Sequence, residues 1–155
     1  MYTLITGCSG FIGYHTTLKL TQQNIKVIGL DNLNNYYDVS LKKKRLNILK
    51  NQKQFKFYKL NIENYNNLEK IFNKYKIKYV IHLAAQAGVR YSITDPDKYF
   101  NSNIKGHYNI INVSKKFKVK HFIYASSSSV YGNSTNSPLT EDEPTDSPQS
   151  FYAAS

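Results

Sequence analysis

Short apolar runs alternate along the chain with longer stretches in which apolar residues recur at helical spacing. The short runs are rich in β-branched and aromatic residues, which is typical of β-strands. They predict strands at residues 3–6, 26–30, 55–60, 79–83 and 121–125. The longer stretches predict helices at residues 12–21, 39–50, 65–75 and 97–117.

The order of these elements predicts the fold class. Each expected helix lies between two expected strands, and this alternation is typical of a parallel sheet with helices on both faces. Several strands are apolar throughout, as strands buried on both faces usually are. We therefore predict an α/β protein built on a doubly wound parallel sheet.

Residues 133–150 differ from the rest of the chain because they are rich in Ser, Thr, Pro and acidic residues. Pro138, Pro144 and Pro148 argue against a regular element in this segment. It is either an exposed linker or an ordered loop over a site, since residues capable of chemistry flank it. The five residues after it are not typical of a natural terminus, so we expect the chain to be interrupted there.

Composition limits the class of protein. A chain of 155 residues can bury the core of one domain. It has no run of about 18 apolar residues that could span a membrane, and its first residues do not resemble a signal peptide. The single cysteine, Cys8, cannot form an internal disulfide. These features favour a cytoplasmic protein.

The chain is strongly basic, with a net charge of +11 and basic runs at residues 42–45 and 115–120. A positive surface can attract nucleic acid or anionic ligands. Neither run carries a nucleic-acid-binding motif, however. We therefore interpret both runs as solvated helix faces and expect no nucleic-acid partner.

A glycine-rich segment carries the strongest chemical signal. It follows the first expected strand, opens the first expected helix, and reads Gly7-Cys8-Ser9-Gly10-Phe11-Ile12-Gly13. The spacing differs from the usual G-x-G-x-x-G, but the same reasoning applies: the glycines allow a tight turn, close approach of a pyrophosphate, and close packing of the helix on the strand. Three glycines can also form a simple turn. The strand-turn-helix setting favours a nucleotide, with its pyrophosphate at the helix N-terminus.

Asp31 follows the second expected strand, at about the 20-residue distance at which an acidic residue binds a ribose 2′-hydroxyl in dinucleotide-binding folds. A carboxylate there would repel a 2′-phosphate, so Asp31 favours NAD over NADP. The alternative is that Asp31 only turns the chain into the residues that follow.

Several segments, in order along the chain, resemble the extended short-chain dehydrogenase/reductases of the NAD-dependent epimerase/dehydratase family. They are the glycine segment, Asp31-Asn32, residues 82–85 and residues 126–132. Three longer strings, at residues 31–42, 84–92 and 124–132, are similar to those of UDP-glucuronate 4-epimerases. Members of that family are longer than this chain. The resemblance therefore implies that residues 1–155 form an incomplete NAD-binding Rossmann domain, with the C-terminal substrate domain missing.

The resemblance implies contacts to NAD along the whole groove. Those to the pyrophosphate would come from Gly7, Gly10, Phe11, Ile12 and Gly13, and those to the adenosine ribose from Asp31 and Asn32. Leu83, Ala84 and Ala85 would pass beneath the dinucleotide, and Asn103 would line the same groove. Family members carry Asp where this chain has Asn61, before Ile62, at the adenine. An amide can still form hydrogen bonds there, so we expect altered rather than lost binding.

The resemblance also implies a catalytic pair, Ser127 and Tyr152, which lie 25 positions apart. The family motif is Tyr-x-x-x-Lys, in which the lysine helps the phenol act as a base near neutral pH. This chain ends at Ser155, one residue before that lysine. For a sugar carboxylate we expect contacts from Ser128 or Ser129 rather than from Arg90.

The serine run separates related reactions. Sugar-nucleotide dehydratases resembling this family carry Thr-Asp-Glu where this chain has three serines, and decarboxylating relatives keep a Glu at the position of Ser129. The absence of both carboxylates favours simple epimerisation. The four histidines have no paired spacing, so we expect no metal; they are His15, His82, His107 and His121.

The function implied by the resemblance is NAD-dependent inversion at C4 of UDP-glucuronate to give UDP-galacturonate, through a 4-keto sugar. One alternative is a UDP-glucose/galactose 4-epimerase or another NAD-linked modifier of a UDP-sugar. Another is a truncated, non-catalytic nucleotide-binding remnant. We expect a homodimeric parent enzyme without a membrane partner. The 155-residue piece should be inactive, because it lacks the motif lysine and the substrate domain.

Overall fold

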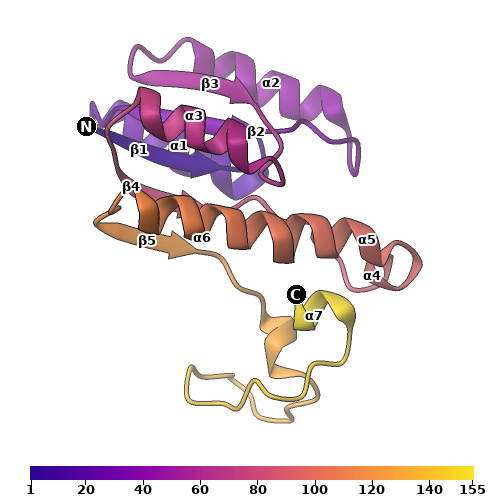
Figure 1. Ribbon diagram of the computed structural model, residues 1–155. Helices are drawn as coiled ribbons and strands as arrows, with labels where there is room; N and C mark the ends of the chain where they lie inside the picture. The colour runs from indigo at the N-terminus through magenta and orange to yellow at the C-terminus, as the bar shows by residue number, and fades with distance from the viewer.

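The computed structural model describes all 155 residues and is built on one five-stranded parallel sheet (Figure 1). The strands are β1 (Tyr2–Thr6), β2 (Val27–Asp31), β3 (Phe55–Lys59), β4 (Ile77–His82) and β5 (His121–Tyr124). Their order across the sheet is β3-β2-β1-β4-β5. All five predicted strands are confirmed, with boundaries that differ by one or two residues.

Helices cover both faces of this sheet. On one face lie α1 (Phe11–Gln22) and α2 (Val39–Lys50), and on the other α3 (Tyr65–Lys74) and α6 (His107–Lys116). Successive residues of a strand point to opposite faces. Accordingly Leu4 packs in the cluster with α3 and α6, whereas Ile5 packs in the cluster with α2. The predicted doubly wound fold is confirmed.

The helix predicted at residues 97–117 is helical throughout but not uniform. It starts as α5 (Pro96–Tyr99), widens into the π-helix η1 (Phe100–Gly106), and continues as α6. Pro96 suits the first position of a helix because it has no N–H to leave unpaired. A further short helix, α4 (Tyr91–Thr94), was not predicted. π-Helical turns are often found at functional sites, and η1 lies beside the groove described below.

Burial on both faces holds for the central strands but not for β5. Ile123 is 50 % exposed and Tyr124 is 58 % exposed. Ile123 lies in register with Ile81, at the edge of the face that α1 and α2 cover, whereas Tyr124 lies on the opposite face beside His107 of α6. No helix of the structure combines the length and apolar character that crossing a membrane requires.

After β5 the chain leaves the sheet, as the orange and yellow segment of Figure 1 shows. This segment carries two short helices, η2 (Ser128–Tyr131) and α7 (Phe151–Ala154), which lie against each other. Residues 133–150 between them form no helix or strand, as the prolines predicted. Gly132 is required at the start, since its φ is +59° and a Cβ there would lie 2.5 Å from the carbonyl oxygen of Ser147.

Candidate functional site

The strand order places a crevice between β1 and β4. From β1 the chain crosses toward β2 and β3, whereas from β4 it crosses toward β5. In open parallel sheets, ligands bind outside the carboxyl ends of the strands at such a point of divergence. The glycine turn follows β1 and residues 83–87 follow β4, so both segments border this crevice.

The glycine turn is shaped so that no side chain could fill it. Gly7 has a φ of +70°, and a Cβ on it would lie 2.9 Å from the backbone nitrogen of Ala84. A Cβ on Gly13 would lie 2.0 Å from the carbonyl oxygen of Gly7. Gly10 precedes α1 without a side-chain cap. The first N–H groups of α1 are therefore available to an anion such as a pyrophosphate.

A buried hydrogen-bond network ties the end of β1 to the end of β4. The Thr6 hydroxyl accepts hydrogen bonds from the N–H groups of Leu83, at 3.1 Å, and Ala84, at 3.0 Å. It donates its own proton to Nδ1 of His82 at 2.6 Å. His82 is therefore neutral, with its hydrogen on Nε2. Burial and, to a smaller extent, His107 lower the pKa of His82 to about 3.

Asp31 ends β2 with both carboxylate oxygens facing backbone donors. Oδ2 accepts from the N–H of Ser9 at 2.9 Å, and Oδ1 accepts from the N–H of Leu33 at 2.8 Å. The second bond turns the chain and allows Leu33 a φ of +55°. The alternative interpretation, in which Asp31 turns the chain, is confirmed, and the contact with a ribose stays a prediction. Each carboxylate oxygen keeps acceptor capacity for a ligand hydroxyl, and Asp31 also lines the groove.

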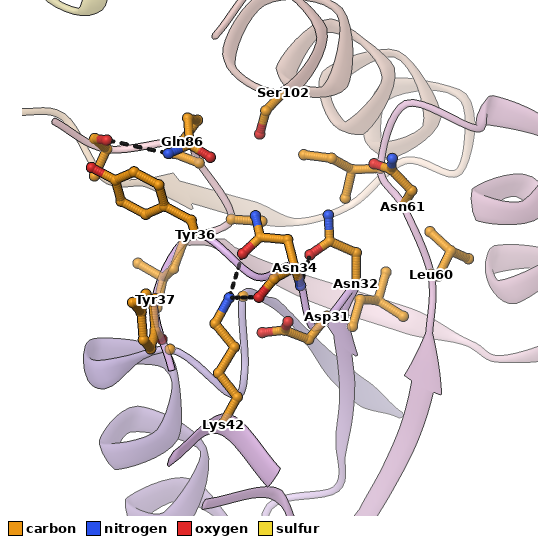
Figure 2. Close-up of a pocket in the computed structure, with 18 residues that line it drawn as sticks. Asp31, Asn32, Asn34, Tyr36, Tyr37, Lys42, Leu60, Asn61, Gln86 and Ser102 are labelled. Atoms are coloured by element: carbon orange, nitrogen blue, oxygen red, sulfur yellow. Dashed lines mark hydrogen bonds between the residues drawn. The ribbon is translucent and has the colours of Figure 1, made fainter. Parts of the chain in front are cut away.

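The groove encloses about 240 Å³ above the carboxyl ends of the strands (Figure 2). The residues predicted to contact the cofactor that line it are Gly7, Gly10, Asp31, Asn32, Asn61, Ile62, Leu83, Ala84 and Ala85. The other lining residues are Leu30, Asn34, Tyr36, Tyr37, Lys42, Leu60, Gln86, Ala87 and Ser102. None of residues 133–150 contributes to the lining.

Lys42 corrects one sequence-based interpretation. It belongs to the run at 42–45, which we interpreted as a solvated helix face, yet it is only 5 % exposed. Its Nζ donates to the carbonyl oxygen of Asn34 at 3.0 Å and to the side-chain oxygen of Asn34, and lies 4.4 Å from the centre of the Tyr37 ring. Figure 2 shows Lys42 reaching from α2 to Asn34 beside Asp31. Burial lowers the pKa of Lys42, and the charge of Asp31 partly opposes this shift.

The remaining predicted cofactor residues lie at or behind the wall of the groove. The side chains of Phe11 and Ile12 are exposed, so only their backbone N–H groups face the turn. Asn103, in η1, is buried behind Gln86. Its Oδ1 accepts from the Gln86 N–H at 2.7 Å, and its Nδ2 donates to the Gln86 carbonyl at 2.9 Å and to Oγ of Ser155 at 3.0 Å.

The predicted catalytic residues lie on the two short helices after β5. Ser127 caps η2, where its Oγ accepts from the Ser129 N–H and donates to the Ser129 hydroxyl, both at 3.2 Å. Tyr152, in α7, packs edge-on against the ring of Tyr99 with centroids 5.9 Å apart. Ser128 and Arg90 are exposed. The contact between η2 and α7 places Ser127 and Tyr152 in the same part of the molecule.

Three of the four histidines take part in ring packing. His82 stacks on His107 with centroids 5.1 Å apart, and His15 packs against Phe11. No three His, Cys, Asp or Glu side chains come together as a metal site would need.

The whole length of the domain matches one family model, described as GDP-mannose 4,6 dehydratase, over residues 4–155. The chain belongs to this family. Among the curated relatives of this chain, Protein CapI of Staphylococcus aureus is 48 % identical over 99 % of the chain and 46 % of its own length. The UDP-glucuronate 4-epimerase of Thermodesulfobacterium geofontis (strain OPF15) is 47 % identical over 99 % of the chain and 47 % of its own length.

Solved structures agree with this family membership. The UDP-glucuronic acid 4-epimerase of Bacillus cereus, in complex with UDP-glucuronic acid and NAD, is 33 % identical with a TM-score of 0.89, over 99 % of this chain and 48 % of that one. The UDP-glucose 4-epimerase of Thermotoga maritima is 34 % identical with a TM-score of 0.85, over 99 % and 47 %. This chain thus spans about half the length of the relatives it matches. The predicted relationship to sugar-nucleotide epimerases is confirmed.

Proposed function

We propose that this chain forms the N-terminal, NAD-binding domain of a nucleotide-sugar epimerase, whose substrate domain would follow it. One observation carries the proposal: an uncapped glycine turn and the Asp31 carboxylate border one groove at the point where the sheet diverges. A groove with a pyrophosphate site at one place and a ribose acceptor at another fits a dinucleotide. The NAD bound by structural relatives supports the same assignment.

The residues present fit this cofactor. The absence of a Cβ at Gly7 and Gly13 lets the turn pack directly on the backbone of Ala84 and of Gly7, which keeps the turn tight at the start of α1. Asp31 would accept the ribose hydroxyl, and a neutral Ala84-Ala85 floor would support the dinucleotide. Bound NAD would supply a hydride acceptor that returns the hydride to the same sugar.

Ser127 and Tyr152 would act on the sugar hydroxyl. Tyr152 would take the proton of the C4 hydroxyl and return it later, and Ser127 would hold that hydroxyl by a hydrogen bond. The Ser127 hydroxyl keeps acceptor capacity while it caps η2. A lysine after Ser155 would complete the motif of the base.

Epimerisation fits this chain better than dehydration, although the family model takes its description from a dehydratase. Elimination of water from the sugar needs an acid and a base beside the ring. Ser127, Ser128 and Ser129 provide hydroxyls but no carboxylate. An exchange of configuration at C4 needs only the tyrosine and a hydride acceptor.

The proposed substrate is UDP-glucuronate, with UDP-galacturonate as product. The relatives at 47 % and 33 % identity that are UDP-glucuronate 4-epimerases support this choice. UDP-glucose is the second candidate, because UDP-glucose 4-epimerases align over the same 99 % of the chain. A truncated, non-catalytic remnant is the third, and the intact mass of the natural protein distinguishes it from an enzyme.

We further propose a cytoplasmic homodimer. Phe100, Ile104, Tyr108 and Ile111 lie along η1 and α6 and are each at least 40 % exposed. An exposed apolar row of this kind is typical of an interaction surface, and a second copy could cover it. Sedimentation equilibrium measures the oligomeric state directly.

The reaction is tested by following UDP-glucuronate by NMR in the presence of a protein in which this chain is followed by the second half typical of its relatives. We expect UDP-galacturonate to accumulate to an equilibrium mixture. Formation of a dehydrated sugar, or no conversion of UDP-glucuronate while UDP-glucose is converted, would contradict the proposed reaction.

A further inference from the structure

Tyr99 ends α5 where the helix widens into η1, and it is the largest side chain that the fold buries completely. Its hydroxyl lies 2.9 Å from the carbonyl oxygen of Ala87 and 2.5 Å from that of Gly88, and donates toward them. Ala87 lines the groove, and Gly88 turns the chain with a φ of +101°. The hydroxyl of Tyr99 therefore fixes the segment after β4 where it borders the groove.

The ring of Tyr99 supports α7. It meets the Tyr152 ring edge-on, with centroids 5.9 Å apart and planes inclined by 69°. Both α4 and α5 contact α7. The side-chain hydrogen bonds of α7 are made by Ser150 and Ser155, so the direction of the Tyr152 phenol depends on ring packing rather than on a hydrogen bond of its own.

Asn103 forms a second connection between the same two parts of the molecule. It follows Tyr99 by four residues on a continuous helix, and residues at this spacing share a face. Its amide holds both backbone groups of Gln86, at 2.7 and 2.9 Å, and donates to Oγ of Ser155 at 3.0 Å. Oγ of Ser155 in turn donates to the carbonyl oxygen of Tyr152 at 2.9 Å. This face of α5 and η1 therefore sets the spacing between the groove and the helix that carries Tyr152.

We infer that Tyr99 is a positioning residue for Tyr152. The inference rests on the proposed function, because it requires Tyr152 to take the proton of a sugar hydroxyl beside a dinucleotide in the groove. A base acts only within hydrogen-bond reach of that proton, and a misplacement of about 1 Å can lower a rate about 100-fold. Tyr99 holds the groove through its hydroxyl and Tyr152 through its ring. Because it is fully buried, it sets their distance without touching the substrate.

The experiment measures kcat and KM for UDP-glucuronate, at saturating NAD, in a protein in which this chain is followed by the second half typical of its relatives. Tyr99→Leu removes both the ring and the hydroxyl, and should lower kcat about 100-fold. Tyr99→Phe keeps the ring against Tyr152 and should lower kcat only about fivefold, the equivalent of one hydrogen bond. In both variants KM should stay within about twofold, since the change affects the reacting step rather than substrate binding.

Phe72→Leu is the matched control. Phe72 is a buried aromatic residue of α3 that packs in the core against Phe117, and it belongs to neither the groove nor α7. This variant should keep the kcat of the unmodified enzyme at a temperature where it is folded. It therefore separates a general loss of core packing from the misplacement of Tyr152.

An unchanged kcat in both Tyr99 variants, a loss no larger than that of Phe72→Leu, or a raised KM at constant kcat would overturn the role of Tyr99 and leave the proposed reaction intact. If Tyr99→Leu does not fold, Tyr99→Phe decides alone, and an unchanged kcat in it would overturn the inference. Failure of the unmodified enzyme to convert either UDP-glucuronate or UDP-glucose would overturn the proposed function, and the role of Tyr99 with it.

Discussion

The hydroxyl of Thr6 gives its proton to Nδ1 of His82 across 2.6 Å, and so joins the ends of β1 and β4 at the floor of the groove. Because two backbone N–H groups already donate to this hydroxyl, it can only act as the donor toward His82. A protonated His82 would present a hydrogen on Nδ1 and would break the bond. The floor of the groove therefore requires a neutral histidine.

Stability should fall as the pH is lowered below the ordinary pKa of histidine. The pKa of His82 is depressed to about 3 in the folded chain, so the unfolded chain binds the proton first as the pH falls through about 6.5. The loss at pH 5 should be about 2 kcal/mol relative to pH 7. Burial also lowers the pKa of His107, which adds to the loss in the same direction.

Urea unfolding at pH 7 and pH 5 measures this difference. In His82→Asn the amide oxygen can still accept from Thr6 but does not titrate, so this variant should lose clearly less free energy of unfolding between the two pH values. Equal losses in the two proteins would show that His82 is not the group responsible.

Loss of the buried charge at Lys42 should weaken NAD binding. Lys42→Met keeps most of the apolar stem but removes the donor to Asn34 and the positive charge in the groove. We expect a decrease in affinity of about tenfold, in the range of a hydrogen bond to a charged group. Lys43→Met is the matched control, because Lys43 neighbours it in sequence but is exposed. Calorimetry that gave the same affinity for both variants would contradict a role for Lys42.

Asn109 should affect ligand binding only at the end of the groove where the adenine of NAD would lie. Asn109→Leu has a similar volume but leaves the carbonyl oxygens of Ile62, which is buried, and of Glu63, which is partly buried, without their donor. We expect a loss of stability of about 2 kcal/mol and weaker binding of NAD, with unchanged binding of nicotinamide mononucleotide, which has no adenine. Asn112→Leu, on the same helix and without side-chain hydrogen bonds, is the control. Equal weakening of both ligands would point to a general loss of folding.

The serine run should distinguish a sugar acid from a neutral sugar. Hydroxyls bind a carboxylate less rigidly than a bidentate arginine does, which suits a sugar that must turn during the reaction. In a longer enzyme that contains this chain, Ser128→Ala or Ser129→Ala should reduce turnover of UDP-glucuronate more than turnover of UDP-glucose. If both variants affected the two sugars alike, the choice of UDP-glucuronate would rest on its relatives alone.

The parts of the site that sequence analysis predicted have local signals. The glycine turn and Asp31 each follow a strand directly, so their positions come from the short-range pattern. The roles of Lys42 and Asn109 depend on contacts that no local pattern contains. Lys42 is part of a basic run, and it is buried only because the loop at Asn34 folds back onto α2. Asn109 reaches residues 46 and 47 positions earlier in the chain.

The difference between local patterns and contacts of distant segments also explains which parts of the fold were predictable. The strands and helices were predictable because their periodicity is strong, whereas the exposure of β5 was not. Ile123 and Tyr124 are as apolar as the residues of a buried strand, but whether a helix covers them depends on the arrangement of distant segments. The π-helical turn in η1 likewise escaped prediction, since it does not alter the apolar pattern enough to be recognised.

The central claim is that this groove holds NAD with its ribose on Asp31. Titration of the chain with NAD and with NADP, followed by calorimetry at the same ionic strength, tests it most directly. NAD should bind at least about tenfold more tightly, because a 2′-phosphate beside the buried Asp31 carboxylate brings two negative charges together. Asp31→Asn should reduce that preference. Equal or tighter binding of NADP, or no binding of either dinucleotide, would contradict the account.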